Sequence, residues 1–224
     1  MEQEVLILDG GPLSGPQVTG IARKKGTVEI GPVAIELMQS AREVVRNVAT
    51  SGKATYSINT GFGALSTTRI DQEKLEELQM NLLRSHAAGV GEPLEEEIVR
   101  GMMVLLAASL CRGMSGARPE VAQCIAEMLN KGVTPVIPSR GSVGASGDLA
   151  PLAHLALVLC GEGTAILGEK SMPGKAAMAA AGITLIVPVE KEGLALINGT
   201  HLMASIATLA LADIALLCEA AVTS

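Results

Sequence analysis

Aromatic side chains are almost missing from this chain of 224 residues, which has no tryptophan, one tyrosine and one phenylalanine. Because aromatic residues usually supply much of the volume of a core, this core must be built from leucine, alanine, valine, isoleucine and methionine. The two aromatics, Tyr56 and Phe62, lie in a single glycine-containing stretch, TYSINTGFG. Their confinement to that stretch is a first indication of a functional site.

Basic residues are also scarce, since 17 Lys and Arg stand against 23 Asp and Glu and give a formal net charge of −6 at pH 7. A chain without a basic excess cannot replace the counterions of a phosphate backbone. We therefore expect no nucleic-acid partner. With 48% hydrophobic and 18% charged residues, the composition is that of a globular protein.

Signals for export and for a membrane are weak. The four cysteines form no C-x-x-C pair, and the first residues, MEQEVLILDGG, lack the basic flank and cleavage pattern of a signal peptide. We therefore expect reduced thiols and a cytoplasmic location. One apolar run, 201–218, approaches the length of a membrane span. Because Asp213 lies inside it and alanine dominates it, we interpret it as a helix of a large soluble bundle and expect no membrane partner.

Hydrophobic periodicity predicts a mainly helical chain with two long loops, 55–69 and 132–147. We predict a small mixed α/β N-terminal part at 1–70, which holds the tyrosine loop, and a helical bundle portion at 71–224. Short strands are expected only at 5–8, at 27–30 and in a hairpin over 164–173, and helices are expected at 32–51, 71–86, 94–111, 118–131, 148–160, 176–181 and from 201 onward.

The most informative segment is GSVGASGDLAPL, at 141–152. Glycines before a helix can bind phosphate, but no Lys-Ser or Lys-Thr pair follows Gly147 and no G-x-G-x-x-G follows a strand, which disfavours a nucleotide site. The triplet Ala145-Ser146-Gly147 can instead react with itself. Attack of the Gly147 amide nitrogen on the Ala145 carbonyl carbon, with loss of two water molecules, gives a methylidene imidazolone. Gly147 has no Cβ to obstruct the attack, and Ser146 supplies the methylidene carbon.

Residues 141–154 resemble the prosthetic-group loop of the histidine and phenylalanine ammonia-lyases. Three more segments match that family in the same order, TYSINTGFG at 55–63, LLRSHAAGVGEPL at 82–94 and NGTHLM at 198–203. The chain is thus identified as a member of the histidine/aromatic amino acid ammonia-lyase family, matching its N-terminal half. The resemblance implies an L-aspartase/fumarase-like helical bundle, no metal, and a 3,5-dihydro-5-methylidene-imidazol-4-one formed autocatalytically from Ala145-Ser146-Gly147.

The resemblance also implies roles for single residues. Tyr56 resembles the base that removes the β-proton, His86 the histidine that contacts the substrate, and Asn198 the residue that hydrogen-bonds to the imidazolone. By themselves they would be taken as a surface tyrosine, a core histidine and a helix N-cap. We expect His154, in the helix after the loop, to be structural. The implied lid and supporting residues are Asn59, Gly61, Phe62, Gly63 and Asp148.

The substrate and the partners follow from the same comparison. Ser85-His86-Ala87-Ala88 is similar to the histidine-specific members, which implies deamination of L-histidine to trans-urocanate and ammonia. However, His201 stands where those enzymes usually have glutamine, so an aromatic amino acid lyase acting on phenylalanine or tyrosine stays an alternative. Family members are much longer than this chain and form homotetramers whose sites draw on several subunits. Activity would then require a C-terminal half from another chain, and a silent assembly or regulatory partner is the other alternative.

Overall fold

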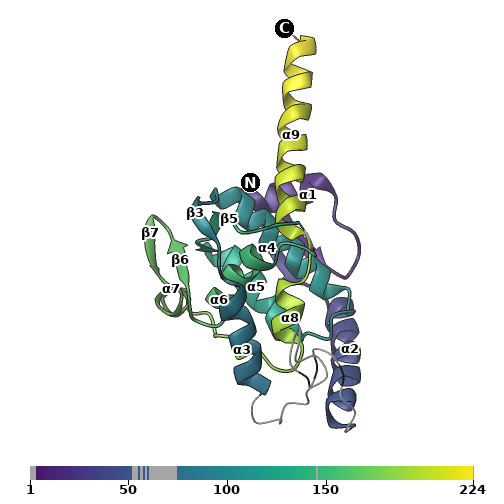
Figure 1. Ribbon diagram of the computed structural model, residues 1–224. Coiled ribbons are helices and arrows are strands. Elements are labelled where there is room, and N and C mark those ends of the chain that lie inside the picture. The colour runs from purple at the N-terminus through teal and green to yellow at the C-terminus, as the bar shows by residue number, and fades with distance from the viewer. Residues whose placement is uncertain are drawn as a thin grey trace.

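The computed structural model describes residues 4–51, 55, 58, 60, 75–144 and 146–223. Helices dominate the described part of the chain (Figure 1), which confirms the predicted mainly helical fold. The helices are α1 (Gly15–Ala22), α2 (Pro32–Thr50), α3 (Leu75–His86), α4 (Glu96–Cys111), α5 (Pro119–Lys131), α6 (Leu149–Leu159), α7 (Gly174–Ala180), α8 (Glu192–Ile197) and α9 (His201–Thr223). The strands are β1 (Glu4–Leu8), β2 (Gly26–Ile30), β3 (Val90–Pro93), β4 (Val133–Pro135), β5 (Pro138–Arg140), β6 (Thr164–Leu167) and β7 (Lys170–Pro173).

Some elements differ from the sequence predictions. β1, β2 and the β6–β7 hairpin were predicted, but β3 was not, and β4 and β5 lie inside the stretch that was expected to be a loop. The restriction of strands to the start of the chain and the hairpin was therefore wrong. β4 pairs with β6 and β5 with β3, so their hydrogen-bond partners are far away in sequence. Strands this short have no alternation of polar and apolar residues from which they could be recognised.

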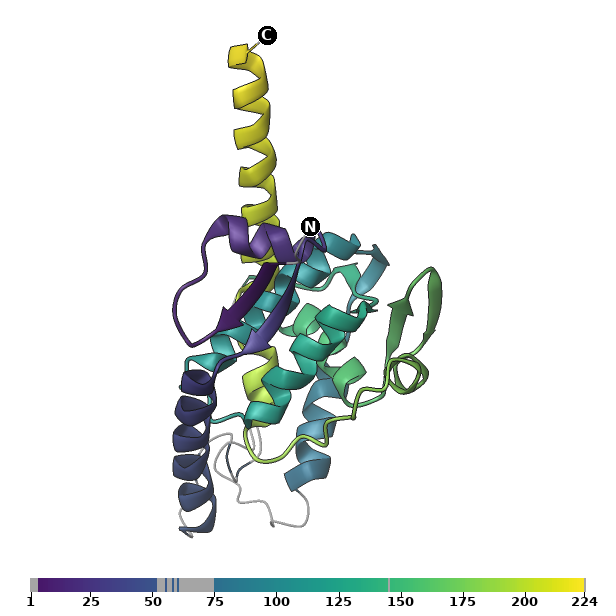
Figure 2. The same ribbon diagram turned by 180° about the vertical axis from the view of Figure 1, so that it is seen from behind.

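The N-terminal strands pair in parallel, from Glu4 opposite Gly26 to Leu8 opposite Ile30. A parallel pair needs a crossover, and α1 supplies it after a capping box formed by Ser14 and Gln17. Figure 2 shows this strand pair on the back of the helical body. The side chain of Asn130 in α5 exchanges two hydrogen bonds of 2.8 Å with the backbone of Val28, which fixes the strand pair to the helices.

Helix α4 is the centre of the core. Met102, Met103 and Val104 are fully buried, and the helix packs against α1, α5 and α9. The buried guanidinium of Arg100 donates to the carbonyl oxygens of Ile21, Ala22 and Leu129 at 3.0 to 3.3 Å. A cation at the C-terminal ends of α1 and α5 satisfies carbonyls that have no partner within those helices. Arg100 therefore joins three helices at one point.

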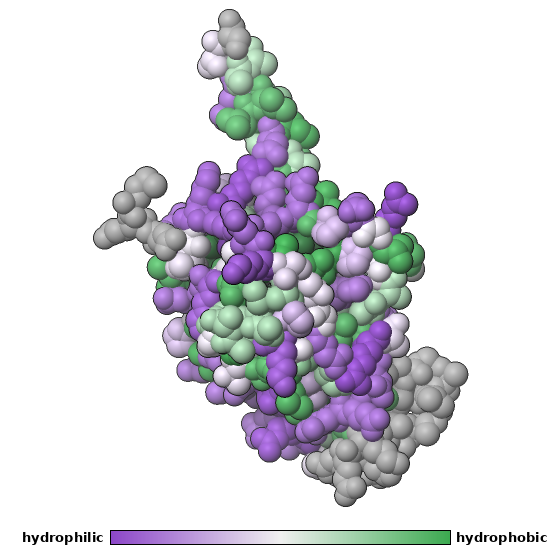
Figure 3. Space-filling model, turned by 90° about the vertical axis from the view of Figure 1, so that its left-hand side faces the viewer, coloured by the Kyte–Doolittle hydropathy of each residue, from purple (hydrophilic) through white to green (hydrophobic). Residues whose placement is uncertain are grey.

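Helix α9 is packed at one end only. Ser205 is buried and donates to the carbonyl oxygen of Ile98 in α4 at 2.8 Å, whereas the second half of the helix projects from the body with apolar side chains exposed (Figures 1 and 3). Residues 192–223 are long and apolar enough to cross a membrane by length and composition. Asp213, inside that stretch, is paired with Arg23 of the helical body at 2.7 Å.

Candidate active site

Three of the four segments that resemble ammonia-lyases meet in the structure. They are the loop 141–148 between β5 and α6, the turn 198–200 between α8 and α9, and the segment 87–89 between α3 and β3. The fourth segment lies largely outside the described residues, as do the predicted site residues Tyr56, Asn59, Gly61, Phe62, Gly63 and Ala145. Within the described part of the chain, no group of three or more His, Cys, Asp and Glu residues could hold a metal ion.

Asp148 links the loop to α9. It occupies the N-cap position of α6, yet its buried carboxylate makes no capping bond to that helix. Instead, Oδ2 accepts from the backbone nitrogens of Leu202 at 2.9 Å and Met203 at 3.1 Å, and Oδ1 accepts from the Ser142 hydroxyl at 2.8 Å. The first amides of a helix need acceptors, and a carboxylate is favoured at its positive end. Asp148 thus caps a helix that begins 53 residues after it in the sequence, at His201.

Gly147 is pressed against the turn before α9. Its φ is +127°, and a Cβ added there would lie 2.5 Å from the carbonyl oxygen of Gly199. That same oxygen accepts from the backbone nitrogen of Asp148 at 2.7 Å. No side chain fits at this position, so the sequence requirement for glycine has a steric cause. Ser146, the next residue toward the N-terminus, is exposed.

His86 is the last residue of α3 and is half-buried. Its Nδ1 lies 2.9 Å from the carbonyl oxygen of Leu82 and 3.1 Å from the Ser85 hydroxyl. A carbonyl oxygen only accepts, so the bond to Leu82 requires the proton on Nδ1. In the neutral ring, Nε2 then keeps its lone pair for another donor.

The segment after His86 touches the start of the loop. The backbone nitrogen of Gly89 donates to Nε2 of His154 at 3.1 Å. A Cβ added to Gly141 would lie 3.1 Å from the Cα of Gly89, so the two backbones are in close contact. The predicted substrate residue and the predicted electrophile loop are therefore connected through packed backbone.

Asn198 ends α8 in an extended conformation, with φ −100° and ψ 99°, and its residue is exposed. It directly precedes Gly199, which contacts both Gly147 and Asp148. Its place is consistent with the role that the resemblance implies. The alternative reading as a helix N-cap is wrong, because Asn198 is the C-cap of α8.

His201 begins α9 beside the same turn. A Cβ added to Gly199 would lie 2.1 Å from Cε1 of His201, so the ring fills the space beside that glycine. Its Nδ1 is buried and has no hydrogen-bond partner in the described part of the protein. Burial lowers the pKa of His201, and the nearby Asp148 carboxylate opposes that shift. From the sequence, His201 stood out only as a departure from the family motif.

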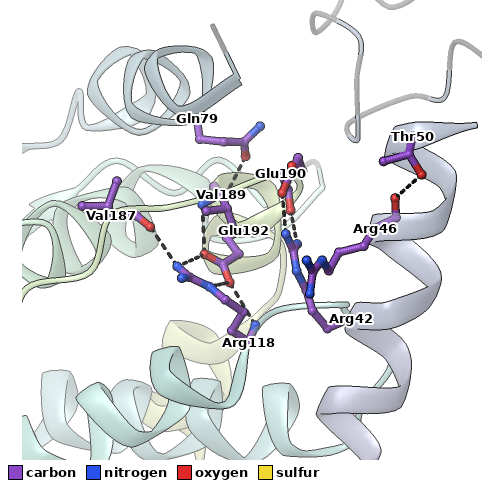
Figure 4. A network of polar contacts seen from close by, with 10 residues as sticks. Arg42, Arg46, Thr50, Gln79, Arg118, Val187, Val189, Glu190 and Glu192 are labelled. Carbon is purple, nitrogen blue, oxygen red and sulfur yellow. Dashed lines mark hydrogen bonds and ion pairs between the residues drawn. The ribbon is translucent and has the colours of Figure 1, made fainter. Parts of the chain in front are cut away.

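A buried ion pair holds α8, and with it the turn 198–200 (Figure 4). The fully buried carboxylate of Glu192 accepts from the Arg118 backbone nitrogen and guanidinium at 2.8 to 2.9 Å, and from the Val189 nitrogen at 3.0 Å. The hydrogen bond to Glu192 raises the pKa of Arg118. Gln79 of α3 accepts from the Gly193 nitrogen at 2.8 Å. α8 is thereby fixed against both α3 and α5.

Comparison with known proteins identifies the family of this chain. The family model for aromatic amino acid lyases matches residues 13–224. Histidine ammonia-lyase of Gloeobacter violaceus is 50% identical over 204 residues, which are 91% of this chain and 40% of the relative, and that of Stigmatella aurantiaca is 48% identical over 209 residues, which are 93% and 41%.

Solved structures agree. Histidine ammonia-lyase from Trypanosoma cruzi superposes with a TM-score of 0.85 and 39% identity over 92% of this chain and 39% of that chain. Ergothionase from Treponema denticola superposes with a TM-score of 0.90 and 30% identity over 94% and 42%. This chain spans about two fifths of the length of the curated relatives. Because the family model covers nearly all of it, the chain belongs to the aromatic amino acid lyase family.

Proposed function

We propose that this chain is the electrophile-bearing part of an ammonia-lyase that converts L-histidine to trans-urocanate and ammonia. The observation that carries the proposal is the seating of Gly147 against Gly199, with Ser146 exposed beside it, in a chain whose curated relatives are histidine ammonia-lyases. The proposed cyclisation needs a residue without a side chain at 147 and a serine at 146, and the chain has both.

The surroundings of Ser146 and Gly147 support the proposed cyclisation of Ala145-Ser146-Gly147. The nitrogen of Gly147 must form a bond to the carbonyl carbon of Ala145, and two water molecules must leave, one of them with the Ser146 hydroxyl oxygen. The hydrogen bond from the Asp148 nitrogen to Gly199 fixes one end of the triplet, and the Asp148 carboxylate fixes it again through α9. Holding reacting groups in place lowers the entropy cost of ring closure. Once formed, the methylidene imidazolone supplies an electrophilic carbon that no ordinary side chain offers.

The remaining roles are proposed from the family resemblance. Tyr56 takes the β-proton of the substrate, His86 contacts the substrate, and Asn198 hydrogen-bonds to the cyclised loop. For His86 the structure adds a physical reason, since the bond from Nδ1 to Leu82 leaves Nε2 as an acceptor in the neutral ring. The resemblance implies a lid or supporting role for Asn59, Gly61, Phe62 and Gly63.

We further propose that the site is completed by the part of the relatives that this chain does not match, in a cytoplasmic homotetramer. The unmatched part would hold the substrate carboxylate. This chain by itself would then orient histidine poorly and turn it over slowly, because catalysis needs the substrate held before the electrophile. The projecting apolar half of α9 supports assembly with a further helical partner.

Two measurements test the proposal. Mass spectrometry of the purified chain should show a loss of about 36 Da, the mass of two waters, and Ser146→Ala should abolish that loss. The chain should then be combined with the unmatched part of the Gloeobacter violaceus relative and assayed for urocanate. Tyr56→Phe should lower the reconstituted turnover by about a thousandfold. A cyclised, assembled pair that turns over phenylalanine or tyrosine instead would support the aromatic lyase alternative, and one that turns over nothing would support a silent partner.

A further inference from the structure

The hydrogen bond between Gly89 and His154 fixes the protonation state of a histidine that the proposed chemistry does not use. The Gly89 nitrogen can only donate, so Nε2 of His154, 3.1 Å away, must present its lone pair. The ring is then neutral with its proton on Nδ1. A protonated ring, or the other neutral tautomer, would place an N–H group against the N–H of Gly89.

Gly89 lies where a small shift would be transmitted to both parts of the proposed site. Gly89 is three residues after His86 and directly precedes β3. β3 pairs with β5, and β5 runs directly into Gly141 at the start of the loop. A Cβ added to Gly89 would meet Nε2 of His154 at 3.1 Å and Cβ of Pro138 at 3.3 Å. The segment is thus packed tightly between α6 and β5, and a side chain at Gly89 would require its neighbours to shift.

We propose that His154 is a positioning residue, which through its hydrogen bond to Gly89 sets the place of His86 relative to the loop 141–148. The inference rests on the proposed function for its catalytic meaning, but the placement itself can be tested without turnover. It replaces the expectation that His154 is merely structural. His154 belongs to α6, the helix that follows the electrophile loop. The loop and the segment that carries His86 are therefore both held by α6.

The same geometry makes the placement sensitive to acid. Burial lowers the pKa of His154, and this favours the neutral ring that the bond to Gly89 requires. Burial alone is responsible for that direction, although charged groups lie on the elements around α6. These are Glu76, Glu77, Arg84 and His86 of α3, Lys175 of α7, Glu192 of α8, Arg140 of β5 and Glu162 after α6. The bond is present at neutral pH and is lost as the pH falls through the lowered pKa.

Nitrogen-15 NMR of the chain as it exists tests the tautomer, because the sequence has only three histidines. At pH 7.5 the His154 ring should show a protonated Nδ1 and an unprotonated Nε2, with the signal assigned by its disappearance in His154→Gln. A proton on Nε2 would overturn the proposal. His201→Gln is the matched control and should leave the Gly89 amide signal unchanged.

Paired variants then test the placement. His154→Gln keeps an acceptor at about the reach of Nε2, whereas His154→Leu keeps volume and removes the acceptor. The signals of the Gly89 amide and the His86 ring should move in the leucine variant and be largely retained in the glutamine variant. Equal signals in both variants would overturn the proposal. If the leucine variant does not fold, lowering the pH of the unmodified protein should produce the same movement.

In the reconstituted enzyme, His154→Leu should raise KM for histidine about tenfold with a smaller effect on kcat, and His154→Gln should restore KM and remove the acid sensitivity of KM. An unchanged KM and pH profile in an active His154→Leu enzyme would overturn the proposal that His154 positions His86 for catalysis. Absence of turnover in every version, together with the expected NMR result, would instead count against the proposed function.

Discussion

The carboxylate of Asp148 accepts a hydrogen bond of 2.9 Å from the backbone nitrogen of Leu202, so the residue before α6 holds the first turn of α9. Gly147, the last residue of the proposed triplet, thereby lies where the N-termini of α6 and α9 meet. Both helix dipoles present their positive ends there, which favours negative charge at this place. The arrangement makes the stability of the loop and that of α9 depend on one side chain.

Asp148→Ala should lower the free energy of unfolding by about 3 kcal/mol, because it removes a buried acceptor of three hydrogen bonds, one of them from Ser142. Urea unfolding followed by circular dichroism measures the change. The control is Glu169→Ala in the exposed turn of the β6–β7 hairpin, which should change stability by less than about 0.5 kcal/mol. Equal effects of the two substitutions would contradict the role of Asp148 as a cap.

Gly147→Ala should prevent the loop from seating and so abolish the two-water mass loss, since its Cβ would meet the Gly199 oxygen at 2.5 Å. Gly144→Ala is a matched control, because Gly144 also has a positive φ, +65°, but has open space around it. The control should cost only about 1 kcal/mol of stability and leave the mass loss intact. Normal cyclisation in the Gly147 variant would refute the steric argument.

Glu192→Gln should destabilise the chain by about 2 kcal/mol, less than for a fully buried ion pair because the partner Arg118 is partly exposed. The exposed pair of Glu127 and Lys131 offers the comparison, and Glu127→Gln should cost no more than about 0.5 kcal/mol. Thermal unfolding of the two variants side by side distinguishes them. A greater destabilisation by Glu127→Gln than by Glu192→Gln would contradict the view that burial makes the Glu192 pair the more important one.

Acid should destabilise the chain through two histidines. Burial lowers the pKa of both His154 and His201 below the ordinary value of 6.5, so their unfolded forms bind protons more readily than the folded forms. Their contribution to stability is fully present above pH 6.5 and is lost as the pH falls through the lowered pKa values. Urea unfolding between pH 7.5 and pH 5 should therefore show a shallower decline in the variant that combines His154→Gln and His201→Gln. An equally steep decline would assign the acid sensitivity to other groups.

The outer half of α9 should drive association. Ile214 and Leu217 are 54% and 68% exposed and lie three residues apart, on one face of the helix. Replacing both by glutamate should convert a self-associating chain into a monomer in sedimentation velocity. Met114→Gln, at another exposed apolar residue, should leave association unchanged. A compact monomer before any substitution would show that this face needs no partner.

Local patterns were enough for most of the fold. α4 and α5 were recognised because their apolar residues recur at helical spacing over several turns, and β1 and β2 because short apolar runs are bounded by turn residues. β4 was missed because it has three residues, one of them proline, and forms only by pairing with β6. α8 was missed because its six residues are held by Glu192 and its distant partner Arg118. Such contacts leave no periodic signal.

The site was predictable to the extent that chemistry restricts residue type. A glycine at 147 and a serine at 146 are required by the proposed cyclisation, so the sequence predicts the triplet from its chemistry, and that prediction stays to be tested. The hydrogen bonds between Asp148 and α9 could not be predicted. An aspartate before a helix is ordinarily expected to cap that helix, whereas here its side chain accepts from the first turn of α9. The bond from Gly89 to His154 joins residues 65 positions apart and was likewise invisible.

Helix α9 has 23 residues and a length of about 35 Å, with its inner end bound to Asp148 and its outer end exposed. If a partner recognises the outer turns of α9 only when they are helical, part of its binding free energy stabilises the helical form of α9. If such a partner binds, thermodynamic linkage would act in both directions, so the seated loop would raise the affinity for the partner by the same factor by which the partner favours seating. Assembly and seating of the proposed electrophile loop would then behave as one cooperative equilibrium, in which subunit concentration shifts the fraction of seated loop.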